Sequence, residues 1–257
     1  MWNPSEYLKF SNHRDRPFFD LVAQVQSDLP RAIADLGCGT GHLTATLAER
    51  FPSARIWGVD SSAEMLEAAQ RHAQPGRLEF VRADLSFWTP PEPLWLIVSN
   101  AALQWVPDHA ALIPRLAGLL EEGGWLAIQM PANFDAPSHT LLRELTSSLR
   151  WRGLLEDSPE PRHSMPTDWY IAVLHDLGFR VNAWQTTYQQ ILYGENPVLE
   201  WVKGTALRPI LAKIEGEDKN EFLLEYGARL LEAYPPQDFG TLLPFKRQFI
   251  VAQKNTR

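Results

Sequence analysis

The feature that most constrains the fold is an alternation of strand-like and helix-like segments in the first half of the chain. Short apolar runs alternate with stretches in which apolar residues recur every three or four positions, the spacing of one helix face. Such an alternation predicts a parallel, doubly wound α/β sheet. The strands are expected at residues 31–36, 55–60, 78–82, 94–98 and 125–130. The helices are expected at 43–51, from Ser61 onward, where Ser61 and Glu64 have capping-box spacing, and at 110–120, with Gly123-Gly124 as C-cap.

The pattern changes after Pro131. Residues 132–166 are rich in Pro, Ser and charge, with one helical piece near 139–149, and residues 197–234 are mostly helical. A helix at 167–177 and strands at 179–192 and 244–252 follow the earlier pattern. We therefore expect a single domain over residues 1–257. Its parts are expected to be a core at 31–131, helical insertions forming a cap at 132–166 and 196–240, and segments completing the sheet at 167–195 and 241–257.

Composition excludes several classes of protein. The chain has 24 Lys+Arg against 31 Asp+Glu, a net charge of −7, which disfavours sequence-independent nucleic-acid binding. One cysteine, Cys38, rules out an intramolecular disulfide and favours a reducing compartment. The longest apolar stretch, 94–98, is too short to span a bilayer, and the first residues lack the pattern of a secretory signal. A cytoplasmic enzyme or binding protein is expected.

A glycine-rich turn at Ala34–Gly41 is the most informative motif. It follows the first predicted strand and opens a helix, and glycines at 37, 39 and 41 allow a tight turn and close approach of a ligand to the backbone. The second predicted strand ends in Asp60, where a carboxylate suits the two hydroxyls of a ribose. The turn therefore predicts a nucleoside-containing ligand.

The spacing of this turn disfavours phosphorylated nucleotides. Gly37, Gly39 and Gly41 form Gly-x-Gly-x-Gly, which departs from the dinucleotide pattern Gly-x-Gly-x-x-Gly, and no Gly-Lys-Ser/Thr follows. A carboxylate at Asp35, beside the turn, would repel a pyrophosphate but would attract an ammonium and a sulfonium. The turn therefore predicts a cationic cofactor.

Four motifs in register resemble the class I S-adenosylmethionine-dependent methyltransferases over residues 30–131. They are Asp35–Gly41, Asp60, Ala83-Asp84 and Asn100. The resemblance implies a Rossmann-like sheet of seven mostly parallel strands with an antiparallel last strand. It also implies S-adenosylmethionine as cofactor, S-adenosylhomocysteine as product and no metal.

The same resemblance implies roles for individual residues. Gly37, Gly39 and Gly41 would pass under the methionine, Asp60 would hold the ribose, and Asn100 would approach the methionine. The adenine would lie near Met65, with Asp84 and Leu85 at its exocyclic amine. Residues 1–30 would form lid helices, in which Tyr7, Phe10 and Arg16 close the site, or an amphipathic helix packed on the sheet. The implied cofactor-binding set is Asp35, Gly37, Gly39, Gly41, Asp60, Ser61, Met65, Asp84, Leu85, Asn100, Tyr7, Phe10 and Arg16.

Further motifs resemble the trans-aconitate methyltransferase family over nearly the whole length. They lie at 2–17, 99–108, 129–131, 184–188, 201–209 and 244–252. This narrower resemblance implies a monomethyl ester formed on a small polycarboxylate, trans-aconitate or a close analogue.

Esterification of a carboxylate needs positioning more than a general base, because the nucleophile is already an anion at neutral pH. A trianionic acceptor must however meet donors, since burying unpaired carboxylates is costly. The candidate substrate-binding residues are Arg208, Lys246, Arg247 and His163. Alternation along a strand puts Lys246 and Arg247 on opposite faces, so at most one points inward easily. Either could equally be a solvated charge, and His163 could be a surface histidine.

Gln104 and Trp105, which follow Asn100, would face the acceptor. The amide of Gln104 could orient the accepting carboxylate, whereas Trp105 could instead be core packing. With Arg208 they form the candidate catalytic set. Cys38 is expected to fill space rather than to act as a nucleophile.

Other functions remain open at this point. The chain could methylate nitrogen or carbon in another small molecule, although Asn100 is not followed by the Pro-Pro-Tyr of amino-methylating relatives. It could esterify a carrier-bound malonyl group, or bind S-adenosylmethionine as a non-catalytic regulator. The expected partner is a small polycarboxylate, without nucleic acid or membrane, and the expected state is a monomer or weak homodimer.

Overall fold

The computed structural model describes residues 11–26, 31–155 and 164–256, which form two compact units. Unit 1 contains residues 11–26, 31–130, 164–185 and 248–256. Unit 2 contains residues 131–155 and Thr186–Arg247.

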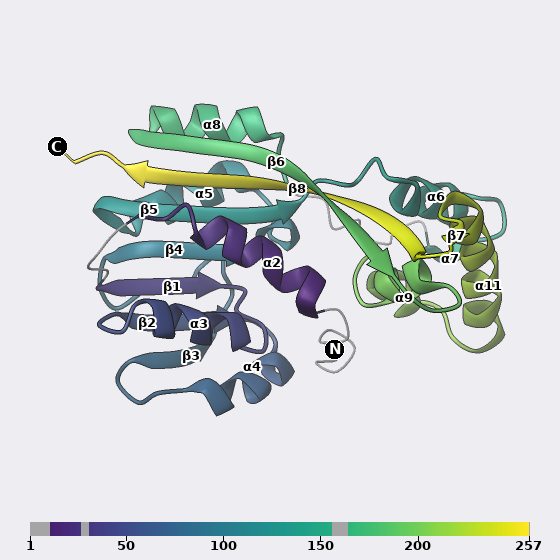
Figure 1. Ribbon diagram of the computed structural model, residues 1–257, viewed down its shortest axis with the longest axis horizontal. Coiled ribbons are helices and arrows are strands. Elements are labelled where there is room, and N and C mark those ends of the chain that lie inside the picture. The colour runs from purple at the N-terminus through teal and green to yellow at the C-terminus, as the bar shows by residue number, and fades with distance from the viewer. Residues whose placement is uncertain (1–10, 27–30, 156–163, 257) are drawn as a thin grey trace. The chain divides into compact units, whose positions relative to one another are not determined.

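One mixed sheet organises the fold, with strand order β3-β2-β1-β4-β5-β8-β6 (Figure 1). The strands β1 to β5 pair in parallel, and β8 runs opposite to β5 and β6 (Figure 1). A two-residue strand, β7, pairs with β8 outside this path. The strands are β1 Ala32–Leu36, β2 Arg55–Asp60, β3 Leu78–Arg82, β4 Leu94–Asn100, β5 Leu120–Pro131, β6 Phe179–Leu192, β7 Pro236–Gln237 and β8 Gly240–Lys254. The predicted α/β sheet of seven mostly parallel strands is confirmed, with β7 added to it.

The strand order places a topological switch point between β1 and β4. From β1 the chain moves outward to β2 and β3 and then returns to the other side of β1. In a doubly wound sheet, ligands bind beyond the carboxyl ends of the strands at such a point. Asp35 of β1 lies in register with Val98 of β4, so the turns that follow these two strands emerge side by side.

Helices cover both faces of the sheet in unit 1. In the view of Figure 1, α2 crosses in front of the sheet, whereas α5 lies behind it and packs against α8. The helices of this unit are α2 Ser11–Val22, α3 His42–Arg50, α4 Ala63–Ala69, α5 His109–Gly118 and α8 Thr167–Asp176, with 3₁₀ turns at Gln70–His72 and Leu103–Trp105. The buried face of α3 consists of Thr44, Leu47 and Ala48, spaced i, i+3 and i+4.

Two local predictions are wrong. Gly123 and Gly124 do not cap α5, which ends at Gly118, but lie inside β5. A β-bulge against β4 accommodates them there, and Gly123 has a φ of 76°. The N-cap of α4 is Ser62 and not Ser61: the Ser62 hydroxyl accepts a hydrogen bond from the Met65 amide at 3.3 Å.

Unit 2 has its own aromatic core. Trp151 and Phe222 pack edge to face at 5.2 Å between ring centroids, and the Trp151 indole donates to Glu225. Gly227 of α11 packs closely against the start of α9, where a Cβ would lie 3.0 Å from the Asn196 side-chain amide nitrogen and 3.1 Å from a Leu199 methyl group. The helices of this unit are α6 Pro137–Thr146, α7 Arg152–Leu155, α9 Pro197–Lys203, α10 Arg208–Leu211 and α11 Gly216–Ala233.

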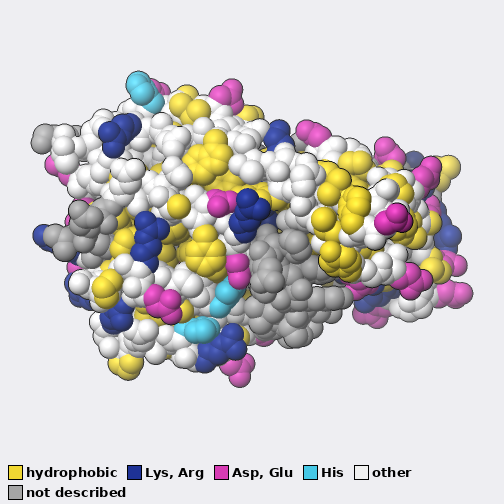
Figure 2. Space-filling model, viewed as in Figure 1, with side chains coloured by type: hydrophobic (Ala, Val, Ile, Leu, Met, Phe, Trp, Pro, Cys, Tyr) yellow, Lys and Arg dark blue, Asp and Glu magenta, His cyan; other side chains and the backbone are white. Residues whose placement is uncertain are grey.

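The surface mixes charges of both signs. On the face drawn in Figure 2, Lys and Arg side chains are interspersed with Asp and Glu. Among the helices that the structure describes, none combines the length and apolar character needed to cross a membrane.

Candidate functional site

Asp60, at the carboxyl end of β2, organises the glycine turn. One carboxylate oxygen accepts the Gly39 amide and the other accepts the Ser62 amide, both at 2.9 Å. These charge-assisted bonds fix the turn after β1 relative to the start of α4. Each oxygen still has a lone pair for a further donor, as the predicted ribose contact requires.

The glycines at 37 and 39 have different reasons to lack a side chain. Both have positive φ, 82° at Gly37 and 55° at Gly39. A Cβ on Gly37 would lie 2.1 Å from the Cβ of Ala102 in the turn after β4, whereas a Cβ on Gly39 would meet no atom within 4 Å. Gly37 is therefore needed for packing of the two turns. Gly39 borders open space, as the predicted passage of the cofactor requires.

Asp35 is a buried carboxyl beneath the turn. It is 3% exposed and accepts the hydroxyl of Thr44 at 2.6 Å. Burial raises its pKa to about 6, and the charge of Asp60 adds to this, whereas Thr44 and His42 act in the opposite sense. Burial likewise raises the pKa of the Cys38 thiol, which agrees with its expected role as a space-filler. A carboxyl with this pKa gains its charge just below neutral pH, so a neighbouring cation would favour the charged form.

Binding of a cation should therefore depend on pH. A cation that lowers the Asp35 pKa binds more tightly above pH 6, so we expect the dissociation constant of S-adenosylmethionine to rise about tenfold between pH 7 and pH 5. Calorimetry in buffers of different ionisation enthalpy measures the accompanying proton release. Asp35→Asn should weaken binding at pH 8 and remove its pH dependence, while raising the melting temperature of the ligand-free protein.

His42 contacts the Thr40 hydroxyl in the glycine turn and the Asp15 carboxylate, so His42→Asn is the control for the Asp35 prediction. Its binding should keep the pH dependence. If His42→Asn lost that dependence and Asp35→Asn retained it, the assignment to Asp35 would be wrong.

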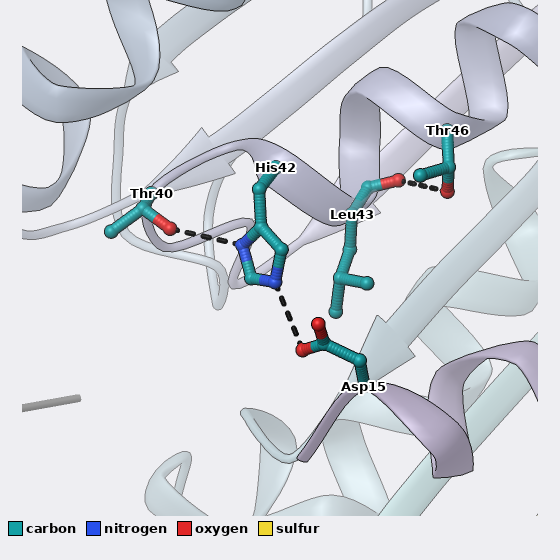
Figure 3. A network of polar contacts seen from close by, with 5 residues as sticks. All are labelled: Asp15, Thr40, His42, Leu43 and Thr46. Carbon is teal, nitrogen blue, oxygen red and sulfur yellow. Dashed lines mark hydrogen bonds and ion pairs between the residues drawn. The ribbon is translucent and has the colours of Figure 1, made fainter. Parts of the chain in front are cut away.

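A polar chain that the sequence did not reveal connects α2 to the glycine turn (Figure 3). Nε2 of His42 lies 2.9 Å from the Asp15 carboxylate, and Nδ1 lies 3.0 Å from the hydroxyl of Thr40. A carboxylate only accepts, so Nε2 carries a proton toward Asp15. These hydrogen bonds connect the end of the glycine turn to α2, between residues 27 positions apart in the sequence.

The residues predicted to surround the adenine differ in how exposed they are and in what they contact. Met65 is buried in α4, whereas Asp84 is exposed and accepts the Ser86 amide at 2.8 Å. Leu85 is half-buried, with a methyl group 3.9 Å from the position of a Cβ on Gly37. Ser61 is exposed, and its carbonyl accepts the Arg82 guanidinium at 3.4 Å.

The turn after β4 presents polar atoms next to the glycine turn. The side-chain oxygens of Asn100 and Gln104 are buried without a hydrogen-bond partner among the described residues. The Gln104 amide nitrogen donates to the Ala101 carbonyl at 2.8 Å, which fixes the orientation of the amide. Trp105 is partly exposed in the same turn. The atom that Gln104 leaves available is thus an acceptor, and only its second N–H remains to contact a carboxylate.

The remaining candidates lie in unit 2, in α2 or outside the described residues. Arg247 is buried with its guanidinium 4.6 Å over the Phe245 ring, whereas the neighbouring Lys246 is exposed. Alternation along β8 thus turns the arginine inward. Arg208 is half-buried at the start of α10. Arg16 is largely exposed in α2, 3.7 Å from Asp20. Tyr7, Phe10 and His163 lie outside the described residues.

Residues 11–26, 31–155 and 164–256 contain no group of three His, Cys, Asp or Glu side chains arranged to hold a metal ion.

Comparison with known proteins identifies the family. Residues 33–124 match the family model described as a methyltransferase domain. The chain is 49% identical to trans-aconitate 2-methyltransferase of Streptomyces avermitilis, covering 98% of this chain and 97% of that protein. It is 48% identical to the protein of the same name from Rhodococcus jostii, covering 98% and 99%.

A solved structure agrees in fold alone. The YcgJ protein of Bacillus subtilis superposes with a TM-score of 0.60 at 16% identity, covering 96% of this chain and 100% of that one. Together with the close relatives and the sheet topology, this confirms the resemblance drawn from the motifs: the chain belongs to the trans-aconitate 2-methyltransferase family, within the class I methyltransferases.

Proposed function

We propose that this protein transfers the methyl group of S-adenosylmethionine to a carboxylate of trans-aconitate, forming a monomethyl ester. The observation that carries the proposal is the 49% identity, over 98% of the chain, to a protein named trans-aconitate 2-methyltransferase. The glycine turn supports it, because the open space at Gly39, the Asp60 carboxylate and the buried Asn100 oxygen fit a nucleoside with a cationic side chain.

The bound cofactor supplies an electrophilic methyl group on a positively charged sulfur. Asp60 would hold the ribose, and Asp35 would favour the cationic form of the ligand over a phosphorylated nucleotide. Asn100 offers a buried carbonyl oxygen, which suits an ammonium donor. The residues of unit 1 would thus select and orient the donor.

The acceptor needs no general base, since its carboxylates are ionised at neutral pH. Transfer would form a bond between a carboxylate oxygen of the acceptor and the methyl carbon as the carbon–sulfur bond breaks, and the cofactor would supply the leaving group, a neutral thioether. Arg208 and Arg247 are proposed to pair with the carboxylates, because the planar guanidinium matches a carboxylate through two hydrogen bonds. Alignment of the two reactants would supply most of the rate enhancement.

The direct test follows methyl transfer from labelled S-adenosylmethionine to trans-aconitate, cis-aconitate, citrate and a malonyl carrier, with mass spectrometry of the ester. We expect trans-aconitate to give the highest kcat/KM. Turnover of the malonyl carrier alone, or cofactor binding without turnover of any acceptor, would contradict the proposed substrate.

Arg208 should act on the acceptor and not on the cofactor. We expect Arg208→Ala to raise the KM for trans-aconitate at least tenfold, the loss of one charge-assisted contact of about 1.5–3 kcal/mol. The dissociation constant of S-adenosylhomocysteine should change less than twofold, and Arg208→Lys should be intermediate. Arg229→Ala removes a partly exposed arginine that pairs with Glu225 in the same unit, and it serves as the control. Equal losses of cofactor and acceptor binding in Arg208→Ala would contradict this role.

A further inference from the structure

The turn after β4 is bounded by two strained residues. Ala101 and Asp108 have φ values of 55° and 53°, and no other non-glycine residue in the described ranges has a positive φ. This conformation costs about 1–2 kcal/mol for a residue with a Cβ, so the surrounding structure must hold it. The strained segment includes Gln104 and Trp105, the two residues of this turn that the sequence predicts to face the acceptor.

A buried hydrogen-bond chain reaches this segment from α8. The Met165 amide donates to the hydroxyl of Tyr170 at 3.0 Å, and that hydroxyl lies 2.5 Å from Nδ1 of His109. Nε2 of His109 lies 2.9 Å from the carbonyl of Leu103. The chain therefore joins residues that are 61 positions apart in sequence, and it ends on the backbone beside Gln104.

The donor and acceptor of each hydrogen bond follow from the two ends of this hydrogen-bond chain. A carbonyl only accepts, so Nε2 of His109 carries a proton toward Leu103. In the uncharged tautomer Nδ1 then accepts from Tyr170, whose hydroxyl also lies 4.0 Å from the Met130 sulfur. Burial raises the pKa of Tyr170, whereas the Met165 amide lowers it, and the hydroxyl keeps its proton for this bond. The His109 imidazole is thus oriented by Tyr170 as it donates to Leu103.

Burying polar side chains at this depth costs free energy, which their hydrogen bonds must offset. Tyr170 is 0% exposed and belongs to a cluster of buried hydrophobic side chains, and its partner His109 is 3% exposed. Apolar residues of the same size would fill this volume without the cost of desolvating a phenol and an imidazole. The Leu103 carbonyl accepts the Val106 amide at 2.9 Å and Nε2 of His109, and an apolar residue at 109 would remove the second of these two donors.

We infer that His109 and Tyr170 are positioning residues, which hold the strained turn Ala101–Trp105 so that Gln104 and Trp105 face the acceptor. The inference rests on the proposed function. His109 is 3% exposed and acts through the backbone of Leu103, so its loss should affect the acceptor and spare the cofactor.

The test compares Tyr170→Phe, His109→Leu and His109→Gln. We expect kcat/KM for trans-aconitate to fall at least tenfold in Tyr170→Phe and His109→Leu, with the dissociation constant of S-adenosylhomocysteine within twofold of wild type. His109→Gln keeps an N–H donor for Leu103 and should recover part of the activity. Tyr226→Phe is the matched control, because this tyrosine is also 0% exposed and donates to a carbonyl, that of Ser138. It should leave kcat/KM within twofold.

Hydrogen exchange gives a readout that does not depend on the acceptor. Amides at 101–106 should exchange faster in Tyr170→Phe and His109→Leu than in wild type, while those at 37–42 should not. If wild type fails to methylate trans-aconitate, the proposed function is wrong, but faster exchange confined to 101–106 still supports the positioning pair. Unchanged exchange, or loss of cofactor affinity in step with activity, overturns it.

Discussion

Gly37→Ala should destabilise the protein severely, whereas Gly39→Ala should leave the fold nearly intact and abolish tight cofactor binding. At Gly37 the new Cβ would lie 2.1 Å from that of Ala102, and the φ of 82° adds strain. We expect a loss of about 3 kcal/mol or more from this collision. At Gly39 only the strain of a φ of 55° applies, about 1–2 kcal/mol, which lowers the melting temperature by a few degrees.

The two glycine variants separate packing from ligand binding. The methyl group in Gly39→Ala projects into the open space proposed for the cofactor, so the dissociation constant of S-adenosylhomocysteine should rise at least 50-fold. Thermal unfolding and calorimetry measure the two effects. Adding Ala102→Gly to Gly37→Ala removes the collision and should restore most of the lost stability. Wild-type affinity in Gly39→Ala would show that the cofactor does not pass this residue.

Asp60→Asn should weaken binding of S-adenosylhomocysteine about 100-fold. The carboxylate accepts two backbone amides, from Gly39 and Ser62, and an asparagine would turn its NH₂ group toward one of them. One charge-assisted bond is lost, and the second becomes a weaker neutral bond. These two bonds are internal to the protein, so their loss lowers its stability. The 100-fold loss of affinity, about 3 kcal/mol, follows from the charge-assisted bonds to the ribose hydroxyls that the carboxylate would also accept.

The control for Asp60→Asn is Asp84→Asn. Asp84 is exposed and accepts one backbone amide, that of Ser86, so its substitution should weaken binding less than tenfold. Calorimetric titration measures both variants. Binding by Asp60→Asn within fivefold of wild type would exclude Asp60 as the organiser of the cofactor site.

Local sequence patterns predicted much of the fold. The bounds of β2, β3 and β6 agree with the apolar and alternating runs at 55–60, 78–82 and 179–192. These strands could be predicted because their side-chain period is set by the pleat itself. The cap of α4 was misassigned because Ser61 and Ser62 are both good N-cap residues, and the Asp60 side chain, which accepts the Ser62 amide, settles which one caps.

The candidate site was predicted unevenly. Alternation required that Lys246 and Arg247 face opposite ways, but only the tertiary structure decides that Arg247 is the buried one, with its guanidinium over the Phe245 ring. Thr44, the partner of Asp35, was missed because the periodicity that predicts the helix at 43–51 counts apolar residues only, so a buried threonine gives no signal. His42 and His109 carried no signal in sequence, since their partners are 27 and 61 residues away.

By itself the sequence determined what depends on neighbours along the chain: the strand and helix periods, the glycine turn, the carboxylate that ends β2 and hence the class of fold. The tertiary structure alone decided which polar groups share hydrogen bonds: Asp15 with His42, Asp35 with Thr44, and His109 with Tyr170. The physical reason is that hydrogen bonds act over about 3 Å and require both partners in place, so they form only after the sheet has brought distant segments together.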